Sequence, residues 1–180
     1  MPKRSLYDTR FFVEYFYSGN SDFLEKLKED LRSVRERMVS VVTIHEIYRI
    51  NLEKEGREVA KLRSETIRRD FQVIEMNYET AIRSAELRAR YRMPMADSII
   101  AAVAQIKSCP IVSDDPHFQN IGNLKTRWYP KSYFMRGDYP ASKKAQTIRK
   151  IIAPNRILSS SLAIIYSLSI PLFVLGKNFA

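Results

Sequence analysis

Short apolar runs of strand length alternate with segments of helical pattern through the first 130 residues of this 180-residue chain. The strand-like runs are residues 4–7, 38–43, 71–76 and 110–113, and Trp128 lies near a further one. Strands that alternate with helices imply a parallel sheet covered on both faces. The sequence therefore predicts an α/β fold. The expected helices, from apolar residues at helical spacing, are 9–17, 21–37, 44–55, 57–70, 78–91 and 97–107.

An acidic residue lies at four junctions between the predicted elements, at or just after the end of an apolar stretch. These residues are Asp8, Glu46, Asp97 and Asp115. In an open α/β fold, the ends of strands and the starts of helices converge on one crevice. Carboxylates that meet there repel one another unless a cation holds them. Because hard cations such as Mg²⁺ and Mn²⁺ prefer oxygen ligands, the pattern indicates a divalent-metal site.

Helix capping is the competing interpretation of each acid taken alone. Asp8 and Asp97 each precede an expected helix, as N-caps do. Glu46 fits a capping box that begins at Thr43, and Asp115 lies in ordinary turn chemistry. For any single residue we favour capping. Three of the four acids follow an apolar strand-like run and would lie at the same edge of one sheet, which shifts the balance toward metal binding.

Other kinds of site find little support in the sequence. His45 and His117 lie next to two of the acids, but their spacing does not fit a zinc site, and we assign them to packing or polar support. There is no Gly-x-Ser-x-Gly elbow and no glycine-rich phosphate loop. The single cysteine, Cys109, forms no internal disulfide, which favours a reducing compartment such as the cytoplasm.

Four short motifs surround the acids in order along the chain. They are Leu6-Tyr7-Asp8-Thr9, Thr43-Ile-His-Glu46, Met95-Ala-Asp97-Ser-Ile-Ile-Ala-Ala102 and Ser113-Asp-Asp115-Pro-His-Phe118. From about Ser5 to Trp128 the chain thus resembles the PIN-domain ribonucleases, and most closely the VapC-type toxins of prokaryotic toxin–antitoxin pairs. The resemblance implies a PIN-like three-layer α/β/α fold with a central, mainly parallel sheet. It places a nuclease domain in residues 1–132 and leaves 133–180 as a C-terminal extension.

The resemblance also implies a Mg²⁺- or Mn²⁺-dependent endoribonuclease that hydrolyses RNA phosphodiester bonds. The expected metal-binding and catalytic residues are then Asp8, Glu46, Asp97 and Asp115, with possible support from Thr9, Ser113 and Asp114. The spacing to Phe118 selects Asp115 over Asp114 as the family acid, although Asp114 could substitute or assist. A cognate antitoxin and a homodimer follow from the same resemblance. The alternative is a catalytically weak PIN module that binds RNA or a protein partner.

The C-terminal extension is strongly basic and partly apolar. Of the net charge of +10, +7 falls in residues 131–180, which favours a polyanionic partner. Solubility is the alternative explanation, and charge alone does not choose between the two. Residues 157–176 carry no charge over a length that could cross a bilayer, so membrane attachment is a further alternative. Five serines and Pro171 dilute this run, and we favour a non-catalytic role for it over a membrane span.

Overall fold

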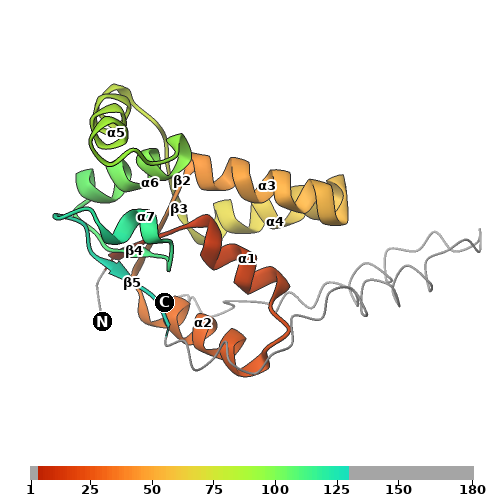
Figure 1. Ribbon diagram of the computed structural model, residues 1–180. Helices are drawn as coiled ribbons and strands as arrows, with labels where there is room; N and C mark the ends of the chain where they lie inside the picture. The colour runs from red at the N-terminus through yellow and green to blue at the C-terminus, as the bar shows by residue number, and fades with distance from the viewer. Residues whose placement is uncertain (1–3, 130–180) are drawn as a thin grey trace, which may run out of the picture. The chain divides into compact units, whose positions relative to one another are not determined.

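The computed structural model of the protein describes residues 4–129, which contain a five-stranded sheet in the order β3-β2-β1-β4-β5 (Figure 1). Every pair of neighbouring strands is parallel. This architecture confirms the α/β fold that the sequence predicts. The strands are β1 (Arg4–Tyr7), β2 (Glu36–Ser40), β3 (Gln72–Ile74), β4 (Ile111–Val112) and β5 (Thr126–Arg127).

The helices of residues 4–129 form two layers, one on each face of the sheet (Figure 1). From β1 to β3 the chain moves toward one edge of the sheet, and from β4 to β5 it moves toward the other. Because parallel crossovers are right-handed, this reversal puts α1–α4 on one face and α5–α7 on the other. The helices are α1 (Thr9–Tyr17), α2 (Ser21–Ser33), α3 (Val41–Glu55), α4 (Arg57–Asp70), α5 (Tyr78–Tyr91), α6 (Met95–Ile106) and α7 (Pro116–Gln119).

The central strand β1 anchors both layers, because successive side chains of a strand point to opposite faces. Leu6 belongs to an apolar core that also contains Ile100 of α6 and Phe118 of α7. Tyr7 faces the other layer, where its ring lies 4.7 Å from that of Phe11 and 5.3 Å from that of Phe71. Both cores therefore fix the C-terminal end of β1, the strand that leads into Asp8.

Most predicted boundaries lie within two residues of those observed, and at two junctions the prediction was wrong by three residues or more. The strand expected over 38–43 ends at Ser40, and its last three residues belong to α3. The reason is local, since the Ser40 hydroxyl caps α3 by accepting a hydrogen bond from the N–H of Val42 at 3.3 Å. The helix expected over 21–37 ends at Ser33, and β2 takes up the last residues of that range.

No helix within residues 4–129 is both long and apolar enough to cross a membrane. The predicted domain boundary at 132 and the whole extension 133–180, with its uncharged run 157–176, lie outside the described residues. The two-part organisation therefore stays a prediction.

Candidate metal centre

The structure brings the four predicted acids together at the C-terminal edge of the sheet. Asp8 directly follows β1, and Asp115 lies shortly after β4, the strand that pairs with β1. The other two acids come from helices, Glu46 from α3 and Asp97 from α6. Asp97 interacts electrostatically with each of the other three. Like charges in such proximity are costly unless a cation or a proton offsets them.

Asp8 is the most buried of the four acids, with 5% of its surface exposed. Its Oδ2 accepts a hydrogen bond of 2.7 Å from the Ser113 hydroxyl. Burial raises the pKa of Asp8 from the ordinary 3.8 to about 6; the charge of Asp97 adds to the shift, and the Ser113 hydroxyl opposes it. The N–H groups of Thr9 and Arg10 also lower the pKa. Asp8 occupies the N-cap position of α1, but its side chain makes no capping hydrogen bond. Capping therefore does not explain Asp8.

Glu46 lies one and a half turns inside α3 and does not belong to a capping box. The helix begins at Val41 and is capped by Ser40, so Thr43 is an interior, buried residue. One carboxylate oxygen of Glu46 accepts a hydrogen bond of 2.5 Å from the hydroxyl of Thr9, the residue after Asp8. The capping alternative for Glu46 is wrong, and Thr9 orients this carboxylate at the edge of the site.

Asp97 lies in the first turn of α6, whose N-cap position is occupied by Pro94. The expectation that Asp97 is an N-cap is therefore also wrong. Its Oδ2 lies 2.9 Å from Nδ1 of His117. The pKa of Asp97 is raised from the ordinary 3.8 to about 6, first by burial and next by the charge of Asp115, while His117 lowers it.

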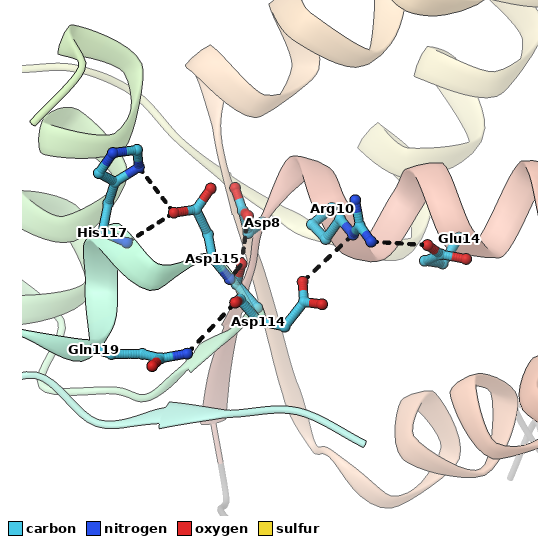
Figure 2. A network of polar contacts seen from close by, with 8 residues as sticks. Asp8, Arg10, Glu14, Asp114, Asp115, His117 and Gln119 are labelled. Carbon is cyan, nitrogen blue, oxygen red and sulfur yellow. Dashed lines mark hydrogen bonds and ion pairs between the residues drawn. The ribbon is translucent and has the colours of Figure 1, made fainter. Parts of the chain in front are cut away.

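The neighbours Asp114 and Asp115 point to different partners (Figure 2). Asp115 Oδ1 lies 2.9 Å from Nδ1 of His117 and accepts a hydrogen bond of 2.8 Å from the His117 N–H, so this residue does cap α7. Asp114 Oδ1 instead lies 3.4 Å from Nε of Arg10, which also contacts Glu14. The side chain that joins the acidic site is that of Asp115. The Ser113 hydroxyl supports it by accepting a hydrogen bond of 3.1 Å from its backbone N–H.

His117 also lies in the site, where its contacts with two acids fit the polar support that we predicted; sequence reasoning missed it only as a candidate ligand. Asp97, Asp115 and His117 each offer one ligand atom, and these atoms all lie within 4.8 Å of one another. Such a donor set fits a divalent ion, and the buried Asp8 adds a negative charge beside it. The sequence signal that could have identified His117 was its position two residues after Asp115. The other histidine, His45, lies exposed on α3.

The sequence matches the PIN domain family over residues 6–124. That match covers about two thirds of the chain, so the protein belongs to the PIN domain family. A search of the curated proteins found no match.

Solved structures of toxin–antitoxin proteins share this fold. The VapBC2 structure from Rickettsia felis, bound to a promoter DNA fragment, superposes with a TM-score of 0.60 at 14% identity, covering 71% of this chain and 99% of its own. Mycobacterium tuberculosis VapC20, described as a sarcin-ricin loop cleaving toxin, gives 0.58 at 18% identity, covering 68% and 98%. A toxin–antitoxin complex from Klebsiella pneumoniae gives 0.55 at 23% identity, covering 67% and 94%. The central parallel sheet and its flanking helices are those of the VapC-type PIN fold.

Proposed function

We propose that the protein is a metal-dependent endoribonuclease that hydrolyses RNA phosphodiester bonds and acts as the toxin of a toxin–antitoxin pair. The observation that carries this proposal is Asp8, a buried carboxylate that forms no ion pair with any lysine or arginine of residues 4–129. Asp97 and Asp115 lie with it at the same edge of the sheet. A site with this charge favours a divalent cation. Similar folds include a toxin described as cleaving the sarcin-ricin loop, which supports the proposal.

The metal would be Mg²⁺ or Mn²⁺, held by Asp8, Asp97 and Asp115, with Glu46 binding directly or through water. When bound, such an ion polarises a phosphodiester and lowers the pKa of a coordinated water. Glu46, which accepts the Thr9 hydrogen bond, would orient the attacking water and accept its proton. Ser113 fixes the orientation of Asp8 through its hydroxyl and of Asp115 through the backbone.

The proposed partners are an RNA substrate, a cognate antitoxin that blocks the acidic site, and a second copy of this chain. Toxin–antitoxin complexes recur among the similar structures, which supports the antitoxin. The basic residues beyond 130 favour a polyanion such as RNA. The single cysteine supports action in the reducing cytoplasm.

The test is cleavage of total cellular RNA by the purified protein, with Mg²⁺, with Mn²⁺ and with EDTA, followed by mapping of the cut ends. We expect cleavage only with metal, and a rate lower by about a hundred-fold or more in Asp8→Asn and Asp97→Asn. Asp22→Asn removes the same charge from an exposed site on α2 and serves as the matched control. Cleavage that persists in EDTA would exclude this mechanism. Metal-independent RNA binding without turnover would favour the catalytically weak module instead.

A further inference from the structure

The ring of His117 contacts two acids of the site, Asp97 and Asp115. Nδ1 lies 2.9 Å from Oδ2 of Asp97 and 2.9 Å from Oδ1 of Asp115. These are the polar contacts of the ring within residues 4–129, and 46% of the side chain is exposed. The capping contact between Asp115 and the His117 N–H fixes the start of α7, so the backbone also sets the place of the ring.

The two distances from Nδ1 match edges of a metal coordination shell, and the three ligand atoms all lie within 4.8 Å of one another. Ions of this size bind their ligands at about 2.0–2.2 Å, and neighbouring ligands of an octahedron then lie about 3 Å apart. A single Nδ1–H points along one direction and cannot satisfy two carboxylates fully, whereas one ion placed among the three atoms contacts all of them. The geometry is thus better suited to three ligands around one cation than to three hydrogen-bonding partners.

The kind of donor matters for which ion is bound. Mg²⁺ prefers an oxygen-only shell with several waters, whereas imidazole nitrogen binds first-row transition ions more readily. We propose that His117 binds the divalent ion through Nδ1, together with Asp97 and Asp115, and shifts the preference of the site from Mg²⁺ toward Mn²⁺. This inference rests on the proposed function in taking the acidic site as a metal centre.

Binding through Nδ1 requires that this nitrogen carry no proton. With 46% of its side chain exposed, the ring can take the neutral tautomer with its proton on Nε2, which leaves the Nδ1 lone pair for the ion. If His117 only held Asp115 in place, its nitrogen would never contact the metal. The two roles therefore differ in a directly observable way.

The experiment uses the full chain, produced without a polyhistidine tag and labelled with ¹⁵N-histidine or left unlabelled. Pulsed electron paramagnetic resonance of bound Mn²⁺ detects a directly coordinated nitrogen. The chain contains two histidines, so in His45→Gln every histidine signal comes from His117. We expect nitrogen coupling, altered by the label, in wild type and His45→Gln, and its loss in His117→Gln. Bound Mn²⁺ without nitrogen coupling in wild type would overturn the role of His117 while leaving a metal-dependent nuclease intact. Wild type that binds no Mn²⁺ would instead contradict the proposed function.

Affinity measurements test the preference. We expect His117→Gln to weaken Mn²⁺ binding about ten-fold and Mg²⁺ binding less than about three-fold, as measured by calorimetry. His45→Gln should change neither. Equal losses for the two ions would overturn the proposed preference, and thermal unfolding without metal checks that each variant is folded. The His45→Gln variant keeps His117 unchanged. The paramagnetic resonance test of nitrogen coupling in that variant therefore remains valid even if His117→Gln fails to fold.

Discussion

Two buried carboxylates lie beside the central strand β1 and are treated differently by the fold. Asp30 of α2 is 6% exposed, forms an ion pair with Arg127 of β5, and accepts a hydrogen bond of 2.7 Å from the Tyr7 hydroxyl. Asp8 is 5% exposed and accepts a hydrogen bond from the neutral Ser113 hydroxyl, with no such ion pair within residues 4–129. Tyr7, which donates to Asp30, and Asp8 are consecutive residues. The end of β1 therefore contacts one acid whose charge is compensated by a cation of the chain, and leads into another whose charge is uncompensated.

This difference separates an acid that holds the fold together from one that serves a site. A buried carboxylate costs several kcal/mol unless a cation pairs with it. The Arg127 guanidinium, which also donates a hydrogen bond of 3.0 Å to the Ser5 hydroxyl, supplies that cation for Asp30. For Asp8 the cation is external to the chain in our proposal. The same type of residue therefore stabilises the protein at one position and destabilises the metal-free protein at the other.

The largest expected effect concerns the compensated acid. Arg127→Met leaves Asp30 buried without its partner and should lower the free energy of unfolding by about 3–5 kcal/mol. Urea denaturation at pH 7 measures this change, and Arg49→Met on the exposed face of α3 is the control, since Arg49 pairs with an exposed Glu53. A loss below about 1 kcal/mol would show that Asp30 does not depend on this pair.

At the uncompensated acid, removal of the charge should affect activity rather than folding. Asp8→Asn retains an oxygen that accepts from Ser113. We expect the rate of Mg²⁺-dependent RNA cleavage to fall about a hundred-fold or more, because the ion loses a buried ligand. Single-turnover cleavage of a labelled RNA measures the effect. Cleavage within about ten-fold of wild type would remove Asp8 from the site.

The metal-free protein should lose stability as the pH rises, because the pKa of Asp8 is raised from 3.8 to about 6 on folding. A raised carboxyl pKa stabilises the folded state below pH 4, and that stabilisation is lost as the pH passes 6. Relative to Asp8→Asn, wild type should lose about 2–3 kcal/mol between pH 4 and pH 7. The raised pKa of Asp97 acts in the same direction. Urea titrations of both proteins at several pH values give the difference, and a pH-independent difference would contradict the predicted burial cost.

The smallest effect is expected at Asp114, which is paired with Arg10 outside the acidic cluster. Asp114→Asn should change RNA cleavage by less than about three-fold, since a partly exposed ion pair contributes little. Asp115→Asn, one residue away, should resemble Asp8→Asn. Equal losses in the two neighbouring variants would mean that both aspartates serve the site.

Much of the fold was predictable because its signals are local. The helices over 57–70 and 78–91 were predicted with their observed bounds, and Asp8 and Asp97 were correctly expected at one edge of the sheet. The end of β2 was not predicted correctly, because the cap formed by the Ser40 hydroxyl outweighs the strand preference of the β-branched residues that follow it. Long-range pairs could not be predicted from the sequence either. The pair of Asp30 with Arg127 has no local spacing signal, and neither has the pair of Asp97 with His117. Only the packing of α6 and α7 brings the second pair together.

The contrast between the two acids is tested most directly by unfolding wild type and Asp8→Asn at pH 7, each without metal and with Mn²⁺ at about a hundred times its dissociation constant for wild type. We expect metal-free Asp8→Asn to be the more stable of the two metal-free proteins. Mn²⁺ should raise the free energy of unfolding of wild type by about 2.7 kcal/mol and that of Asp8→Asn by much less. A metal-free Asp8→Asn that is less stable than wild type, or an equal gain from Mn²⁺ in both proteins, would contradict the assignment of Asp8 to a metal centre.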